Sequence, residues 1–166
     1  MRSLLMLIII SQLINCTHIK NHDSIKGEVT NYGIVRVIDR GQRISSPESI
    51  SGYSDQAATM EIVETTKIIA LKEGVIFGME WCAEGFKSNE AIFLLAVKHP
   101  EVTGFNGKPR TSSISDYPGT PENGEFCNID AYQLSQPREL VEGLWSLSIL
   151  YQGKEIVKKE FLIKNR

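Results

Sequence analysis

His99 is the residue that comes nearest to catalytic chemistry in this chain of 166 residues. A nucleophile needs a base and an orienting group within hydrogen-bond reach, and Asp116 or Glu101 would have to orient His99 for that role. The G-x-S-x-G motif, which presents a serine nucleophile on a sharp turn, is absent from the sequence. A lone histidine before a proline at a strand end is more often structural. The sequence therefore predicts no catalytic residue, and a small periplasmic hydrolase that uses His99 is the alternative.

Metal and phosphate sites are also missing as sequence patterns. His18 and His22 are four residues apart, which suits a metal only on a helix, and they lie in a polar segment that predicts no helix. Neither Cys82 nor Cys127 has a second cysteine or a histidine at zinc-ligand spacing. The glycines are scattered singly, unlike the glycine-rich loops that hold phosphates. We predict no metal and no cofactor.

The N-terminal segment has the pattern of a secretion signal. Arg2 supplies a positive charge, and Leu4 to Ile10 is an uninterrupted apolar run. That run is too short to cross a hydrocarbon layer of about 30 Å, which needs roughly 20 apolar residues, but it suits the apolar region of a signal peptide. We predict a signal peptide over 1–15 and a polar tether over 16–26. A buried N-terminal strand or helix is the alternative.

Cys16 stands where the predicted leader ends. The segment Leu13-Ile14-Asn15-Cys16 resembles a bacterial lipobox, in which the cysteine becomes the lipidated first residue. Leu13 fits this pattern, whereas Asn15 departs from the small residue expected before the cysteine. Lipidation of Cys16 would anchor the protein to a membrane in the periplasm, because two acyl chains together give stable attachment. Ordinary cleavage nearby and a retained leader remain alternatives.

Two cysteines, Cys82 and Cys127, remain once Cys16 is set aside. An even number in an exported protein indicates a disulfide, which would stabilise the fold by about 4 kcal/mol in the loop-entropy model. Alternation along the strand places Cys82 on the opposite face from Trp81, which weakens the prediction unless a bulge intervenes. The alternative is a pair of buried free thiols.

Alternating apolar residues indicate an all-β fold for residues 27–166. In the closing hairpin, Trp145 and Leu147 begin a buried face, and Ser146 lies on a wetter one. About seven strands separated by turns predict an immunoglobulin-like antiparallel β-sandwich, with a small β-barrel as the alternative. The predicted strands are Glu28–Ile38, Met60–Leu71, Val75–Cys82, Ala91–Lys98 (ended by Pro100), Glu125–Leu134, and a hairpin from Gly143 to Ile163.

Two long segments without a sustained period are predicted to be loops: Asp39–Thr59 and Glu101–Gly124. Long loops in compact domains are either functional or disordered, and exposed aromatic residues in them can anchor a partner. Serines of the first loop, such as Ser49, are predicted to be solvated. The candidate contact residues in or beside the loops are Arg40, Arg43, Tyr53, His99 and Tyr117. More ordinary interpretations are a solvated strand end for the arginines and loop residues pinned to the core for the tyrosines.

Several short motifs occur in an order that resembles a known family. They are Asn31-Tyr32-Gly33-Ile34, Val75-Ile76-Phe77-Gly78-Met79, Val97-Lys98-His99-Pro100, Glu142-Gly143-Leu144-Trp145-Ser146-Leu147, Tyr151-Gln152-Gly153-Lys154 and Lys159-Glu160-Phe161. Together they resemble the bacterial domain-of-unknown-function family numbered 3859, over roughly residues 27–163. The resemblance implies an immunoglobulin-like exported domain and no established activity. This chain departs from the family pattern by its insertion at 40–59 and by its Cys82 and Cys127 pair.

Charge and composition narrow the function. The formal net charge is −2, which argues against a nucleic-acid binder, because such proteins normally present a basic surface. We predict a lipid-anchored, non-catalytic binding or assembly module of the bacterial envelope, whose partner is another envelope protein or a surface ligand. A purely structural sandwich that self-associates through an edge strand is a further alternative, and the sequence leaves the oligomeric state open.

Overall fold

The computed structural model describes residues 25–56 and 58–165. The predicted signal peptide (1–15), the predicted lipidation site Cys16 and most of the predicted tether (16–26) lie outside the described residues. Within the described part, no helix has the length and apolar character to cross a membrane.

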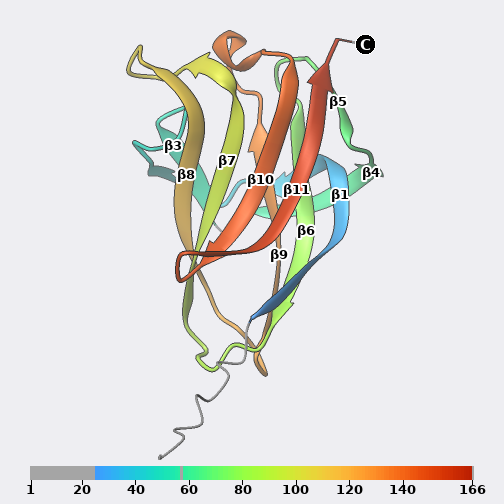
Figure 1. Cartoon of the computed structure of the whole chain (residues 1–166), viewed down its shortest axis with the longest axis vertical. Coiled ribbons are helices and arrows are strands. Elements are labelled where there is room, and N and C mark those ends of the chain that lie inside the picture. Colours follow the sequence, from blue (N-terminus) through green and yellow to red (C-terminus); the bar gives the residue numbers. More distant parts are fainter. Residues whose placement is uncertain (1–24, 57, 166) are drawn as a thin grey trace, which may run out of the picture.

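Two sheets packed face to face form the body of the molecule (Figure 1). The first contains, in spatial order, β4 (Thr59–Thr65), β1 (Lys26–Asp39), β6 (Ile76–Glu84) and β9 (Glu125–Gln133). The second contains β5 (Ile68–Ala70), β11 (Lys154–Lys164), β10 (Gly143–Tyr151), β7 (Ala91–Thr103) and β8 (Pro109–Gly119). All neighbours are antiparallel except β5 and β11. The predicted antiparallel β-sandwich is confirmed, and the barrel alternative is wrong because the two sheets do not close on each other.

Aromatic and aliphatic side chains fill the space between the sheets. Phe77 and Trp81 of β6 and Trp145 of β10 are fully buried, and the rings of Phe77 and Trp145 meet edge to face with their centroids 6.0 Å apart. Burying one such side chain removes 150–250 Å² from water, which stabilises the fold by about 4–6 kcal/mol at 25 cal/mol per Å². The alternating patterns of β6 and β10 therefore do supply facing halves of one core.

The serines of β10 differ from the prediction. Ser146 and Ser148 face away from the core, yet each is only 7% exposed. The reason is that β10 lies between β7 and β11, and the side chains of Lys98 and Lys158 stand on the neighbouring strands directly opposite them. The predicted wetter face is thus covered by its own neighbours.

The predicted strand Ala91–Lys98 corresponds to β7, and its predicted end at Pro100 is wrong. Strand β7 continues to Thr103, and its pairing with β8 shifts register between Lys98 and Val102. A proline cannot donate to a ladder but is tolerated at such an irregularity. The chain passes Pro100 there and regains its pairing at Val102.

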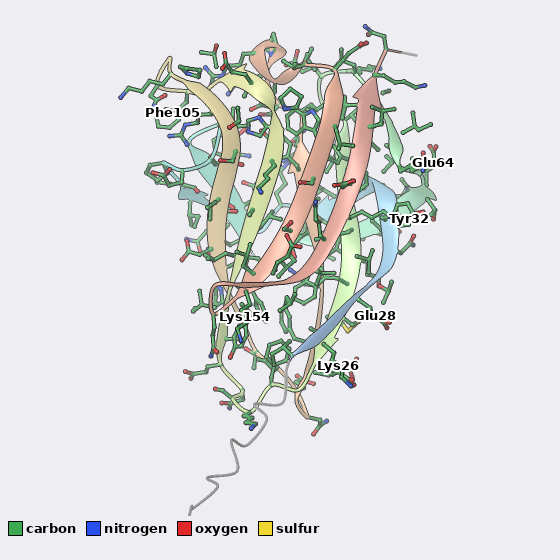
Figure 2. All side chains as sticks on the ribbon, in the orientation of Figure 1. Lys26, Glu28, Tyr32, Glu64, Phe105 and Lys154 are labelled. Atoms are coloured by element: carbon green, nitrogen blue, oxygen red, sulfur yellow. A yellow bond between two sulfur atoms is a disulfide. The ribbon has the colours of Figure 1, made fainter. Side chains whose placement is uncertain are left out.

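The predicted loop Glu101–Gly124 is also wrong, because it contains the whole of β8. The inward positions of β8 carry Ser113, Ser115 and Tyr117 instead of an apolar series, so the alternation is hidden. Phe105, in the turn between β7 and β8, lies at the end of the sandwich opposite Lys26 (Figure 2).

The predicted loop Asp39–Thr59 contains a hairpin, β2 (Gln42–Ser45) paired with β3 (Tyr53–Gln56). Its connecting segment is not simply solvated: Ile50 is fully buried. Ser49 donates to the carbonyl oxygens of Ser46 and Tyr53, each at 2.9 Å. The segment is therefore ordered and packs against the core through Ile50.

The predicted strand Met60–Leu71 is divided into β4 and β5, which belong to different sheets. The Thr66 hydroxyl accepts the backbone N–H of Ile68 at 3.1 Å and so forms the turn between them. Short 3₁₀ helix η1 (Pro137–Glu139) connects β9 to β10.

Cys82 and Cys127 form a disulfide, as predicted, and the free-thiol alternative is wrong. The two residues are register partners on β6 and β9. Alternation correctly placed Cys82 away from Trp81. No bulge is needed, because the bond joins neighbouring strands on the outer face of one sheet.

Candidate functional site

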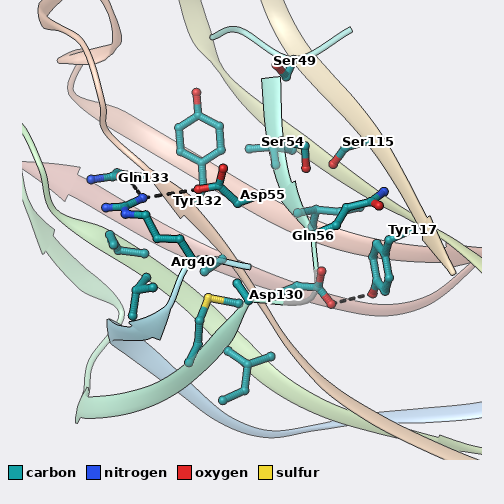
Figure 3. Close-up of a pocket in the computed structure, with 18 of the residues that line it drawn as sticks. Arg40, Ser49, Ser54, Asp55, Gln56, Ser115, Tyr117, Asp130, Tyr132 and Gln133 are labelled. Atoms are coloured by element: carbon teal, nitrogen blue, oxygen red, sulfur yellow. Dashed lines mark hydrogen bonds and ion pairs between the residues drawn. The ribbon is translucent and has the colours of Figure 1, made fainter. Parts of the chain in front are cut away.

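A pocket of about 330 Å³ opens at the edge of the sandwich where β8 and β9 are the outermost strands (Figure 3). We call it the edge pocket. Strand β3 and the segment before it cover it, with Tyr53, Asp55 and Gln56 in its lining. Pockets for small ligands have volumes of about 300–1,000 Å³ and occur where elements separate. The edge pocket is thus at the small end of that range.

Polar inward positions create this pocket. Strand β9 turns Asn128, Asp130 and Tyr132 toward its interior, and β8 contributes Ser115 and Tyr117. Serine is too small to fill the space between sheets about 10 Å apart. The two edge strands therefore leave a hollow where apolar side chains would have closed the core.

Asp130 forms the floor of the edge pocket. Its side chain is 6% exposed, and its Oδ2 accepts hydrogen bonds from Trp81 Nε1 and the Tyr117 hydroxyl, both at 2.7 Å, and from Asn128 Nδ2 at 3.2 Å. Burial raises the pKa of Asp130 above its ordinary value, while hydrogen bonds from these donors act in the opposite direction. Burial also raises the pKa of Tyr117, with the Asp130 charge adding to the shift, so its hydroxyl keeps its proton and remains a donor.

Ion pairs form one rim of the edge pocket. Asp55 on β3 receives Arg43 Nε at 2.8 Å and Arg40 Nη1 at 3.3 Å. Arg40 also donates to Gln133 of β9 at 3.3 Å. The hydrogen bond from Arg43 lowers the pKa of Asp55, and Arg40 adds to the effect. These contacts fasten β3 to β9 across the mouth.

Backbone contacts fasten the opposite side of the cover to β8. Gln56 Nε2 donates to the carbonyl oxygen of Asp116 at 3.1 Å. Arg110 donates to the carbonyl oxygens of Glu48 at 2.9 Å and Pro47 at 3.1 Å. The cover is therefore held at both edge strands, and the carbonyl oxygen of Glu48 also accepts the backbone N–H of Ile114 on β8 at 3.4 Å.

The structure brings together four of the five candidate contact residues. Arg40, Tyr53 and Tyr117 line the edge pocket. Arg43 lines the adjoining depression, and its guanidinium stacks on the Tyr53 ring with Cζ 4.0 Å from the ring centroid. Tyr117 lies in strand β8 and not in a loop.

His99 is separate from this group. Its imidazole packs on Trp145 with ring centroids 4.9 Å apart, and Nδ1 lies 2.7 Å from the carbonyl oxygen of Pro100. Nε2 is buried and has no hydrogen-bond partner among the described residues. Burial lowers the pKa of His99, which keeps the ring neutral. Glu101 and Asp116, the carboxylates that could orient it, are exposed, and no hydrogen bond within the described chain joins either to His99.

Sequence reasoning missed Asp130 and Gln133. The signal for Asp130 was available: it shares the parity of Phe126, Tyr132 and Leu134 in the predicted strand Glu125–Leu134. A carboxylate on a core-facing parity must find donors or lie at a functional hollow, because burying it alone is costly. Gln133 has the opposite parity in that strand, so alternation alone could not have identified it as a pocket residue.

The cysteines do not make a metal centre in this state. Among the described residues, the ligand atoms of Cys82, Glu125 and Cys127 lie within 4.8 Å of one another. Both sulfurs belong to the disulfide, which leaves one carboxylate, whereas a structural metal needs several ligands.

Two packed sheets of mostly antiparallel strands with a shared core place the chain in the class of immunoglobulin-like β-sandwiches. The crystal structure of an immunoglobulin-like protein from Pseudomonas aeruginosa has a similar fold, with a TM-score of 0.60 and 18% identity, covering 87% of this chain and 99% of that chain. The sequence belongs to the family described as domain of unknown function DUF3859, which matches residues 24–163. The predicted family membership is confirmed.

Two other solved structures resemble part of the chain. One is the alkylpurine DNA glycosylase of Pseudomonas fluorescens bound to DNA containing an abasic site analog, with 12% identity, coverage of 60% of this chain and 28% of that chain, and a TM-score of 0.43. The other is the β-glucosidase of Listeria innocua in complex with glucose, with 10% identity, coverage of 63% and 16%, and a TM-score of 0.41. Scores this low carry no functional argument. No curated protein matches the sequence.

Proposed function

We propose that this domain is an exported, non-catalytic binding module of the bacterial envelope that holds a small polar ligand in the edge pocket. The observation that supports this function is the lining of the pocket: a hollow of about 330 Å³ in which hydroxyl, amide and carboxyl groups lie among apolar side chains. Stability alone favours an apolar core without voids. Polar groups kept around a hollow, at some cost in stability, are typical of functional sites.

Export is the part of the proposal that rests on the leader and the cysteines. A disulfide persists in oxidising compartments and is rare in the cytosol, so the bond between Cys82 and Cys127 fits an exported protein. Lipidation at Cys16 would hold the domain at a membrane surface. The ligand would then be a molecule of the envelope or of the surrounding medium.

Binding without turnover is supported by the chemistry of the lining. Among the described residues of the edge pocket there is no histidine and no cysteine to serve as a base or nucleophile. Two serines of the lining use their hydroxyls in contacts within the protein. The Ser49 hydroxyl donates to backbone carbonyl oxygens, and the Ser135 hydroxyl donates to Glu139 Oε2 at 3.1 Å, which also accepts the backbone N–H of Ser135 at 2.6 Å. The lining can recognise the hydrogen-bond donors and acceptors of a polar ligand.

The test is a thermal-shift screen with amino acids, sugars, polyamines and small carboxylates as probes. A ligand present at 100 times its Kd stabilises the folded state by about 2.7 kcal/mol. Ser115→Phe places a ring in the edge pocket and should abolish the shift. Ser112→Phe is the matched control, since Ser112 lies on the same strand, exposed and outside the pocket lining.

Three results would contradict the proposal. The first is that no probe raises the melting temperature of the wild type, or that any such rise is also seen in Ser115→Phe. The second is conversion of a bound probe to a product during long incubation, which would make the domain an enzyme. The third concerns export: intact mass of membrane-extracted protein should show cleavage before Cys16 with added acyl mass, and an uncleaved leader would reject the envelope location.

A further inference from the structure

We infer that the edge pocket binds ligands through a protonated amine, with Oδ1 of Asp130 as the acceptor. The inference rests on the proposed ligand-binding function and deepens it by naming the chemical class. The ligand is a small organic cation whose ammonium group reaches the floor of the pocket and whose body lies among the tyrosines.

One oxygen of Asp130 is fully used by the protein. Trp81 Nε1 and Asn128 Nδ2 can only donate, and both donate to Oδ2, as does the Tyr117 hydroxyl. Three donors on one oxygen fix the orientation of the carboxyl group. They come from β6, β8 and β9, so both sheets hold it in place.

The second oxygen of Asp130 has no donor. Every hydrogen bond to this side chain within the described residues is made to Oδ2. Figure 3 shows Tyr117 bonded to one oxygen while the other points away from it, on the side of Gln56. Oδ1 is not among the fully buried, unpartnered side-chain atoms of the described residues. It is therefore open to the hollow, and its position in the lining makes it available to a ligand.

The remaining charges of the edge pocket neutralise each other. Asp55 is paired with Arg40 at the rim and with Arg43 outside it. Asp130 is therefore the one charge in the described lining without an ionic partner. A cationic ligand would balance it, whereas an anion would be repelled. A neutral alcohol could donate a hydrogen bond but would leave the buried charge uncompensated.

Aromatic faces around the pocket also favour a cation. Tyr53, Tyr117 and Tyr132 belong to the lining, and an aromatic face attracts an ammonium group within about 6 Å. One face of Tyr53 already carries the Arg43 guanidinium. The tyrosines also provide apolar surface for a compact organic body. The site thus combines one unpartnered carboxylate oxygen with a partly aromatic wall.

The experiment compares matched probes that differ only in the donor group. Calorimetric titration with benzylamine and benzyl alcohol, and with glucosamine and glucose, gives an amine-to-alcohol affinity ratio for the wild type. We expect a ratio of about tenfold or more, since hydrogen bonds to charged groups contribute about 1.5–3 kcal/mol. Asp130→Asn keeps the shape and should reduce the ratio to about one. Asp116→Asn removes an exposed carboxyl of β8 outside the lining and should leave it unchanged.

A second measurement holds even if Asp130→Asn does not fold. In the wild type, the ratio should fall as the pH is lowered and Asp130 takes up a proton, while benzylamine stays charged. The other titratable groups of the described lining are Arg40, the paired Asp55, and three tyrosines. Burial keeps Tyr117 and Tyr132 protonated, and the arginines hold the pKa of Asp55 low.

The outcomes separate this inference from the proposed function. Equal affinity for amine and alcohol, with both abolished by Ser115→Phe, would overturn the amine assignment and leave a pocket that binds neutral ligands. An amine preference that survives both Asp130→Asn and acid would also overturn it. If no member of either pair binds, the amine assignment is wrong, and the broader screen above then decides whether the pocket binds anything.

Discussion

The disulfide should stabilise this domain almost entirely through the unfolded chain. Cys82 and Cys127 are 45 residues apart, and closing a loop of that length lowers the entropy of the unfolded chain by an amount worth about 4 kcal/mol at 25 °C. Both sulfurs lie on the outer face of the first sheet, and Cys127 is exposed. Replacing both cysteines by serine therefore opens no cavity in the core. We expect the double variant to lose about 4 kcal/mol and no native contact beyond the bond itself.

Urea unfolding followed by tryptophan fluorescence measures this loss. Both indoles, Trp81 and Trp145, are fully buried, so each reports exposure of the core. The denaturant slope should be larger in the double variant, because an uncrosslinked unfolded chain exposes more surface. The wild type in reducing agent is the matched control and should behave like the variant.

A loss below about 1 kcal/mol with an unchanged slope would refute this reasoning. It would mean that the unfolded chain keeps β6 and β9 close together without the bond. A variant that does not fold at all would refute it in the other direction, since domains of this kind have about 5–15 kcal/mol of stability. The bond would then be holding the native sheet together.

Three further predictions concern single residues. Asp130→Asn should change the pH dependence of stability, because the raised pKa of Asp130 means that its stabilising effect is complete below its ordinary value of 3.8 and is lost as the pH rises through the folded value. Urea unfolding should therefore show the wild type losing stability relative to the variant as the pH rises above about 4, and a constant difference would contradict this. His99→Gln should remove an acid sensitivity of the fold, because the lowered pKa of the buried ring makes the folded state lose stability as the pH falls below the ordinary value of 6.5. Equal slopes of stability against pH in the wild type and the variant between pH 7.5 and 5 would count against a buried neutral histidine. Gly33→Ala should lower the free energy of unfolding by about 1–3 kcal/mol or more, because Gly33 has φ of +143° and a Cβ there would meet the carbonyl oxygen of Glu64 on β4. Gly74→Ala is the control for a positive-φ glycine without the clash, since a Cβ there meets nothing within 4 Å. Equal losses of stability in the two variants would show that the contact with β4 is unimportant.

The sequence predicted those strands in which every second side chain is apolar and is also buried in the core. The closing hairpin and β6 alternate apolar residues because each buries one full face, so Trp81 and Trp145 could be assigned to the core. Strand β8 was missed because its inward residues, Ser113 and Ser115, line a hollow. The same polar residues that create the edge pocket remove the period by which a strand is recognised.

The site was predicted only in part, for a related reason. Arg40, Tyr53 and Tyr117 were noticed as residues able to make contacts, yet they are distant in sequence, and only the arrangement of β3, β8 and β9 brings them to one place. His99 was noticed for its type alone, and its surroundings make it a buried packing residue. Asp130 could have been found by asking which polar residue of the predicted strand Glu125–Leu134 alternates in step with the core-facing ones.

The position of β1 determines how the domain would bear a mechanical load. It is an inner strand, with Gly33 to Asp39 paired to β4 and Lys26 to Ile34 paired to β6. Antiparallel hydrogen bonds run perpendicular to the strands, so a pull on the chain ahead of Lys26 along the strand loads many of them at once, in shear. An edge strand pulled from its end would instead be peeled away one bond at a time. A domain attached through this end would therefore resist tension best along the axis of its own attachment.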